Sequence, residues 1–349
     1  MTERIFMNSR LVSLTHARQR GLTLLELMVA MVIALVVVLA ALAAMLFARE
    51  GFSTIDSSSQ LRENARFLTE LISRVVIQAG YRSTTSGPIS RSTNWYPPQL
   101  LPPDIEGFDN SVTTANATSN PIASGSVVAR SASTCGASDT SCVNGSDILV
   151  VRFQGENKPD GSADGSMINC SGKLQGHDTK NQTVSDVTNV FYVQRSASTE
   201  PVLMCATLDA TDGWQAQPLI SGVESFQVLY GTDGVTPNVA VANPAANTAA
   251  AVPVPNPPDR WLRADQIVVA GDSDGTKRNW RRVTDIRIGL VLRGLPSQGS
   301  SQARTVYPFS EGASSPFAVS ADAGTVLAVP ADRRLRQTVT FNVHLRNTL

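Results

Sequence analysis

The feature that most constrains this chain is an uninterrupted apolar run at residues 27–48, which contains no charged residue, no glycine and no proline. At a rise of about 1.5 Å per residue, a helix of this length spans roughly 33 Å, enough to cross the hydrocarbon core of a bilayer. Residues 1–21 carry four arginines but only one acidic residue, Glu3. By the positive-inside rule the N-terminus stays in the cytoplasm. The sequence therefore predicts a single-pass membrane protein with an exported head.

A cleavable secretory signal is the ordinary alternative for an apolar run near an N-terminus. Such a signal has an apolar stretch of about 7 to 15 residues that ends in a small-residue cleavage site. This run is longer, and no such site ends it. Glu26 also stands at its edge, and a charged side chain costs about 2.5 to 3.5 kcal/mol at the middle of a membrane. Glu26 therefore needs a partner that offsets this cost.

The stretch from Arg18 to Glu26, RQRGLTLLE, closely resembles the type III leader of type IV prepilins and of type II secretion pseudopilins. The resemblance implies that a prepilin peptidase cuts after Gly21 and methylates the new amino terminus at Leu22, where phenylalanine is commoner in the family. Glu26 then matches the family's signature glutamate at the fifth position of the mature chain. Its carboxylate can neutralise the free amine of a neighbouring subunit, which offsets the burial of both charges. A glutamate solvated by lipid headgroups is the alternative interpretation.

Helical periodicity continues beyond the apolar run. Apolar residues recur at steps of three or four at Leu61, Ala65, Leu68, Ile72, Val75 and Ala79. No proline interrupts residues 22–79, and Gly80 is a suitable stop. The pattern predicts one helix of about 58 residues, roughly 87 Å long. We expect a leader at 1–21, a transmembrane and filament-core helix at 22–48, an amphipathic helix at 49–80 and a β-rich head at 81–349.

The head is predicted to contain six strands, at residues 148–153, 190–193, 202–208, 223–230, 286–292 and 339–345. The last three alternate most clearly between apolar and polar residues, which predicts an antiparallel sheet with one buried face. Residues 81–146 are rich in Ser, Thr, Asn, Gly and Pro and are predicted to be mainly loop. The proline-rich stretch 237–258 is predicted to be an exposed loop. The expected fold class is α+β and pilin-like: one long N-terminal helix packed on an antiparallel sheet with long loops.

The four cysteines all follow the apolar run, and none forms a C-x-x-C pair: Cys135, Cys142, Cys170 and Cys205. In an exported region this favours structural disulfides over metal or redox chemistry. Sequence alone permits three connectivities for four cysteines. We expect each cysteine to pair with its nearest partner in sequence, Cys135 with Cys142 and Cys170 with Cys205.

Little in the sequence indicates catalysis, a cofactor, a metal site or nucleic-acid binding. The 29 basic and 29 acidic residues balance, so the basic footprint of a nucleic-acid binder is missing. Motifs such as G-x-S-x-G and H-E-x-x-H do not occur, and His344 is expected on a solvated strand face. The acidic runs 160–165 and 272–275 lack the full spacing of a calcium loop, so ordinary turns are the preferred interpretation. The cluster Arg333, Arg334 and Arg336 is expected to be a solvated strand entry, although it could also steer a partner.

Segments at both ends of the chain add a second resemblance. LRENARF at 61–67, QAGY at 78–81 and RRLR at 333–336, leading to LRN at 345–347, resemble minor pilins of the PilW family. The resemblance implies a non-enzymatic subunit that starts or joins a type IV pilus, first in the inner membrane with its head in the periplasm and then at the cell surface. Implied partners are the prepilin peptidase, other minor pilins and the major pilin, the inner-membrane assembly platform and a tip adhesin.

Two other functions fit parts of the sequence. A minor pseudopilin of a type II secretion system has the same leader, helix and sheet, but the large head, the four cysteines and the Arg-rich C-terminal strand favour the pilus. A membrane-anchored periplasmic adhesin or enzyme has one helix and a secreted head, but it needs neither Gly21 nor Glu26. Adhesion through the Ser/Thr-rich loops is compatible with the pilin interpretation.

Overall fold

The structure is a computed structural model of the chain that describes residues 21, 23–83, 102–129, 143–176, 186–195, 200–209, 213–242, 257–296, 302–309, 312, 316–317 and 322–347. The chain divides into two compact units, residues 1–52 and residues 53–349. The first unit holds the N-terminal part of a long helix, and the second holds the rest of that helix and the β-rich head.

The predicted single long helix is confirmed as α1, Leu24–Val76. It ends before the predicted Ala79, because the N–H groups of Gln78 and Ala79 donate to carbonyl groups only three residues back, at 3.2 and 3.0 Å. Gly80 then takes a positive φ of 72°, and its N–H donates to the carbonyl oxygen of Arg152 at 3.0 Å. Gly80, the predicted stop, therefore lies just beyond the helix, where the chain hydrogen-bonds to β4, Ile148–Gln154.

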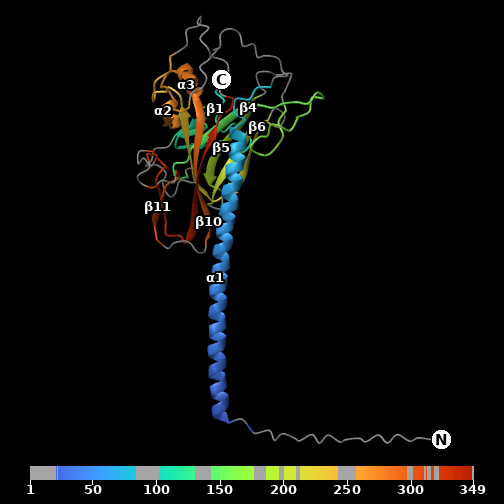
Figure 1. The fold of residues 1–349 in the computed structure, drawn as a ribbon, viewed down its shortest axis with the longest axis vertical. Coiled ribbons are helices and arrows are strands. Elements are labelled where there is room, and N and C mark those ends of the chain that lie inside the picture. The colour runs from blue at the N-terminus through green and yellow to red at the C-terminus, as the bar shows by residue number, and fades with distance from the viewer. Residues whose placement is uncertain are drawn as a thin grey trace, which may run out of the picture. The chain divides into compact units, whose positions relative to one another are not determined.

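Two antiparallel sheets form the head (Figure 1). The first has five strands in the order β1-β4-β5-β6-β7: Ile105–Phe108, Ile148–Gln154, Asp186–Arg195, Pro201–Asp209 and Gly213–Ser221. The second has four strands in the order β13-β10-β8-β9: Arg334–His344, Val283–Pro296, Val223–Thr232 and Arg260–Leu262.

Smaller elements complete the head. Two ribbons pair β2 with β3 and β11 with β12: Ser111–Thr113 with Val127–Ala129, and Arg304–Val306 with Leu327–Val329. Two short helices, α2 and α3, lie between β9 and β10 in the chain: Ala264–Ile267 and Ser273–Trp280.

All six predicted strands are present, as β4, β5, β6, β8, β10 and β13. Residues 81–146 were predicted to be mainly loop, and their described part contains only three short strands, β1, β2 and β3, which were not predicted. These strands are short, and glycine and polar residues interrupt their apolar pattern. Strand β7 was also missed, because it is polar at alternate positions and contains Pro218, a residue tolerated at the edge of a sheet. Residues 237–242, at the start of the proline-rich stretch, form no helix or strand, as predicted, and residues 243–256 lie outside the described part.

The second half of α1 packs against the sheets, as the periodicity predicts. Leu68, Ile72 and Val75 are fully buried, and they share one apolar cluster with Phe191 of the five-stranded sheet and Ile288 of the four-stranded sheet. Figure 1 shows this end of α1 running into the head among its strands. One helix face therefore forms the centre of the head's core.

The prediction that the sheet has a single buried face is wrong. Every residue of β4 and of β8 is buried. On the outer face of β10, Val291 packs with Leu327 and Val329 of β12. The ribbons and loops that follow the main strands thus cover faces that alternation alone would leave in water.

The disulfide between Cys170 and Cys205 is confirmed. It joins the segment that follows β4 to the middle of β6, and both cysteines lie in the main core. Cys135 and Cys142 lie outside the described residues, so their pairing stays a prediction.

Two neighbouring residues of α1 test this packing directly. Leu68 is fully buried, whereas Phe67 is 47% exposed. Leu68→Ala removes buried methyl groups and leaves a cavity, so we expect it to lower the free energy of unfolding by about 2 to 5 kcal/mol. Phe67→Ala should change it by about 0.5 kcal/mol, as is usual for surface positions. Denaturant unfolding of the full chain in detergent measures both, and equal effects would contradict the assigned helix face.

Candidate functional site

The start of α1 carries a reciprocal capping arrangement. The backbone N–H of Glu26 donates to Oγ1 of Thr23 at 3.3 Å, and Oε2 of Glu26 accepts from the backbone N–H of Thr23 at 3.4 Å. This is a capping box, in which the first and the fourth residue each satisfy a backbone donor that the helix leaves free. This capping box was not predicted, although the T-x-x-E spacing of Thr23 and Glu26 indicates one. Glu26 therefore has a local role in starting the helix besides its expected role in assembly.

The N-terminal part of α1 is apolar on every side and contacts little of its own chain. The large apolar side chains from Leu24 to Phe47 are each at least 50% exposed. By length and composition α1 is able to cross a membrane. A helix that is apolar all round is stable only when lipid or other helices cover it. The exposed apolar surface of this part of the chain is suited to contact with lipid or with helices of neighbouring subunits.

The predicted processing site lies just ahead of this helix. Gly21 is exposed and belongs to no helix or strand, with open space around the position of a Cβ atom, so a peptidase would meet no obstruction from the described residues. Leu22 lies outside the described residues. Cleavage after Gly21, methylation at Leu22 and charge neutralisation by Glu26 stay predictions.

A second cluster of charged groups lies inside the head, where the sequence analysis expected solvated arginines. It comprises six residues, here called the ionic network: Glu200, Glu224, Arg293, Asp332, Arg334 and Arg336. The side chain of Arg336 is only 2% exposed and that of Glu224 only 6%. The expectation of a solvated strand entry is therefore wrong for this arginine. Arg333, by contrast, is exposed, with a positive φ of 56°.

The geometry of the ionic network explains why buried arginines are tolerated. Nε of Arg336 lies 2.7 Å from Oε2 of Glu224, and Nη2 of Arg336 lies 2.6 Å from Oδ2 of Asp332. Glu224 also accepts from Arg293 at 3.2 Å. The hydrogen bond from Arg336 holds the pKa of Asp332 down at about 2. Three guanidinium groups thus face three carboxylates, and each buried charge has a partner.

The network ties together segments that are far apart in the sequence. Nη2 of Arg334 in β13 lies 2.8 Å from Oε1 of Glu200, which stands just ahead of β6 in the five-stranded sheet. Arg293 in β10 pairs in register with Arg336 in β13 and also contacts Glu200. The network therefore links the C-terminal strand to both sheets.

Other residues singled out in the sequence have structural roles. Asp272 caps α3 by accepting from the N–H of Gly275 at 2.7 Å. Asp160 and Asp164 each accept from the serine two residues on. Among the described residues, no group of three or more His, Cys, Asp and Glu side chains could hold a metal ion. His344 is 69% exposed, with Nδ1 3.1 Å from Oδ1 of Asp285. The interpretation as an ordinary turn agrees with the contacts of residues 160–165, but it is wrong for residues 272–275, which form the cap and the first turn of α3.

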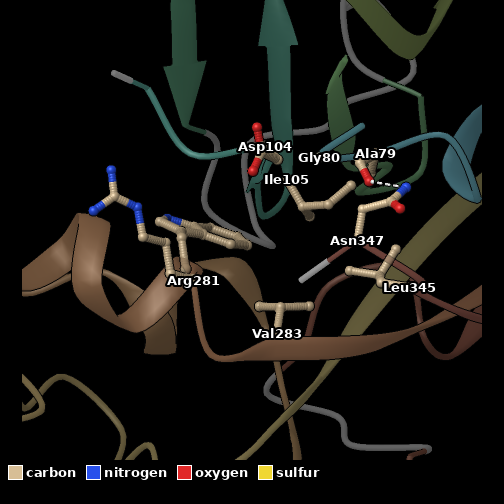
Figure 2. Close-up of a pocket in the computed structure, with 9 residues that line it drawn as sticks. Ala79, Gly80, Asp104, Ile105, Arg281, Val283, Leu345 and Asn347 are labelled. Atoms are coloured by element: carbon tan, nitrogen blue, oxygen red, sulfur yellow. Dashed lines mark hydrogen bonds between the residues drawn. The ribbon is translucent and has the colours of Figure 1, made fainter. Parts of the chain in front are cut away.

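The end of the chain closes over the end of α1. Figure 2 shows Asn347 donating to the carbonyl oxygen of Ala79, at 3.2 Å, beside Gly80. The hollow there has a volume of about 20 Å³ and is also lined by Asp104 and Arg281. This is room for about one water molecule, far below the roughly 300 Å³ at which small-molecule sites begin. The hollow is therefore too small for a ligand, and the hydrogen bond from Asn347 holds the segment that follows β13 against the end of α1.

Comparison with known proteins adds to this geometry. Residues 190–347 match the family model described as Type IV Pilus-assembly protein W, PilW, and residues 16–42 match the prokaryotic N-terminal methylation motif. A type IV-like pilin from Thermus thermophilus is 15% identical over 82% of this chain and 96% of its own, with a TM-score of 0.38. No curated protein matches the chain by sequence.

The methylation motif together with the long apolar helix and the antiparallel head defines a type IV pilin-like protein. The chain resembles, in particular, the minor pilins of the PilW family, and the ionic network lies wholly within its PilW-matched residues. The motif implies processing by a prepilin peptidase and partners among other pilins.

Replacing Arg336 tests the ionic network. Arg336→Met keeps most of the side chain's volume but leaves the buried Glu224 and the partly exposed Asp332 short of a cation, so we expect a loss of about 3 to 5 kcal/mol in the free energy of unfolding. Arg333→Met, at an exposed position, should change it by about 0.5 kcal/mol. Denaturant unfolding of both variants, as full chains in detergent, is the measurement.

The same variant changes the response to acid. Because the folded-state pKa of Asp332 is about 2, its stabilising effect is present above pH about 4 and is lost as the pH falls toward 2. Arg336→Met should lose less stability over that range than the wild-type chain. An unchanged acid response, or equal stability losses for the two arginine variants, would contradict the network's role.

Proposed function

We propose that the chain is a minor pilin that helps to start a type IV pilus or is incorporated into it. The observation that carries the proposal is α1 itself, because one continuous helix has an exposed apolar part bearing Glu26 and a second part that forms the core of the head. The first part supplies an apolar surface that a filament or a membrane can bury. The second part supplies a head that is stable without it.

In this proposal the chain is made as a precursor and held in the inner membrane by residues 22–48, with the head in the periplasm. Cleavage after Gly21 exposes an amine at Leu22, and Glu26 of one subunit neutralises that amine on its neighbour. Residues 49–80 support the head, residues 81–349, which is presented on the outside of the filament. The partners are the prepilin peptidase, other minor pilins, the major pilin, the inner-membrane assembly platform and a tip adhesin.

A minor pseudopilin of a type II secretion system is the competing assignment. The match of residues 190–347 to PilW favours the pilus. A membrane-anchored adhesin or enzyme is less favoured, because the leader motif has no purpose in such a protein.

A deletion strain separates the two filament assignments. We expect loss of most surface pili, counted by electron microscopy, with unchanged secretion of a type II substrate. Expression of the wild-type chain from a plasmid should restore the pili. Normal piliation together with failed secretion would contradict the pilus assignment and select the pseudopilin.

Two variants of Glu26 in the same strain separate charge from helix capping. Glu26→Gln keeps an oxygen that can complete the capping box with Thr23 but removes the charge, whereas Glu26→Ala removes both. Both should be inserted and cleaved, with Leu22 found first by mass spectrometry, because losing a charge makes insertion easier. We expect neither variant to restore pili. Restoration by Glu26→Gln alone would show that capping, not charge pairing, is the role of Glu26.

A further inference from the structure

The two sheets of the head are joined by a buried carboxylate at the start of β4. Oδ1 of Asp147 accepts from the N–H of Asn110, between β1 and β2, at 2.9 Å. Its Oδ2 accepts from the N–H of Val228 in β8 at 2.8 Å, and the backbone N–H of Asp147 donates to the carbonyl oxygen of Phe226 at 2.8 Å. Asp147 is buried. The side chain therefore fastens the edge of the five-stranded sheet to a central strand of the four-stranded sheet.

Two more buried carboxyl groups lie close enough to interact with Asp147. Asp109 has a side chain only 16% exposed, and Asp322 is 6% exposed. Each disfavours ionisation of Asp147 by charge repulsion. Oδ1 of Asp322 is buried without a hydrogen-bond partner among the described residues. The hydroxyl of Tyr230, fully buried and equally without such a partner, feels the charges of Asp147 and Asp109.

Positive charge near these groups is scarce. Arg263 lies with its Nε 3.7 Å from Oδ2 of Asp109, but its Nε and Nη2 are engaged by Asp265, at 3.0 and 2.8 Å. The nearby Glu106 already pairs with Arg152 at 2.8 Å. Among the described residues, one guanidinium thus serves Asp109, Asp265 and Asp322, whereas the side chain of Asp147 is held by backbone N–H groups. A buried carboxylate without a cation costs several kcal/mol, so such a group keeps its proton instead.

The pKa values follow from this arrangement. Burial, then repulsion from Asp265, raises the pKa of Asp109 to about 6. Burial, then repulsion from Asp109, raises the pKa of Asp322 to about 7. Burial likewise raises the pKa of Asp147 well above its usual range. An acid whose pKa is raised by folding contributes stability below its unfolded value near 4, and this is lost as the pH rises through the folded value. For Asp109 and Asp322 the affected window therefore runs from about pH 4 to about pH 7.

Asp322 stands at the start of the segment that leads into β12. The N–H and the hydroxyl of Thr325 both donate to its backbone carbonyl, at 3.3 and 2.8 Å. Gly324 is packed so closely against Gln227 of β8 and the turn at Asn144 that a Cβ atom would have no room there. Movement of Asp322 into water would pull this segment away from the sheet.

We propose that Asp109, Asp147 and Asp322 form a proton-operated clamp, which holds residues 322–329 against the four-stranded sheet while Asp109 and Asp322 keep their protons and loosens them when these two carboxyl groups ionise beside Asp147. Loosening uncovers Val291 on the outer face of β10, which Leu327 and Val329 otherwise cover. A head presented outside the cytoplasm would meet the pH of the medium directly. The clamp belongs to the head alone and does not depend on the proposed role in pilus assembly.

Hydrogen exchange of the full chain in detergent, read by mass spectrometry at pH 5 and pH 8, tests the clamp. Rates are divided by the intrinsic rate at each pH, so that only protection is compared. In the wild-type chain, protection of the amides in 325–329 should fall about tenfold or more from pH 5 to pH 8, the factor that corresponds to one pKa unit of differential stabilisation. Amides of β5, in the other sheet, should show no comparable change.

Variants show whether the pH response comes from Asp109 and Asp322. Asp322→Asn mimics the protonated group, so protection of 325–329 should stay high at both pH values. Asp274→Asn, at an α3 side chain that is 41% exposed, should leave the wild-type pH response. Asp109→Asn should reduce the response independently if the first variant folds poorly. Equal protection of the wild-type chain at the two pH values, or an undiminished response in both cluster variants, would overturn the proposal.

Discussion

The two parts of α1 differ in burial, and this difference determines what each part must pack against. Leu68, Ile72 and Val75 are fully buried between the sheets, whereas the large apolar side chains from Leu24 to Phe47 are at least half exposed. Each square ångström of apolar surface kept in water costs about 25 cal/mol. The first part of the helix must therefore be covered by lipid or by helices of other chains. Residues 53–349 form a compact unit of their own, and a membrane anchor and a filament core both meet this need.

Within the head, buried charged side chains link the two sheets to each other. The Asp147 carboxylate joins a strand edge of one sheet to the centre of the other, and the ionic network around Arg336 and Glu224 links the C-terminal strand to both. Breaking a buried ion pair is costly, although an apolar replacement of both partners is often equally stable. Such groups serve to select one arrangement of two sheets among those that an apolar core alone would permit.

Elements that depend on contacts between residues close in sequence could be predicted, whereas those that depend on contacts between distant segments could not. The helix and the strands with a regular apolar period were predicted correctly, because periodicity is local, and the Thr23 and Glu26 capping box was equally readable. Strand β7, with Pro218 and alternating polar residues, depends on pairing with β6 and was missed. Arg336 looked solvated because Glu224 is 112 residues away in sequence. Burial of the acidic cluster at Asp147 likewise depends on contacts between distant segments, which no local pattern announces.

Site-specific photo-crosslinking in piliated cells shows which part of α1 contacts other subunits. A photoreactive amino acid is placed at Phe47, on the exposed apolar part of α1, and in a second strain at Leu68, on the buried part. The account predicts that position 47 forms adducts with the α1 helices of other pilins, while position 68 links only to strands of its own head. Adducts of position 68 with other subunits, or the absence of protein adducts at position 47 in cells that make pili, would contradict it.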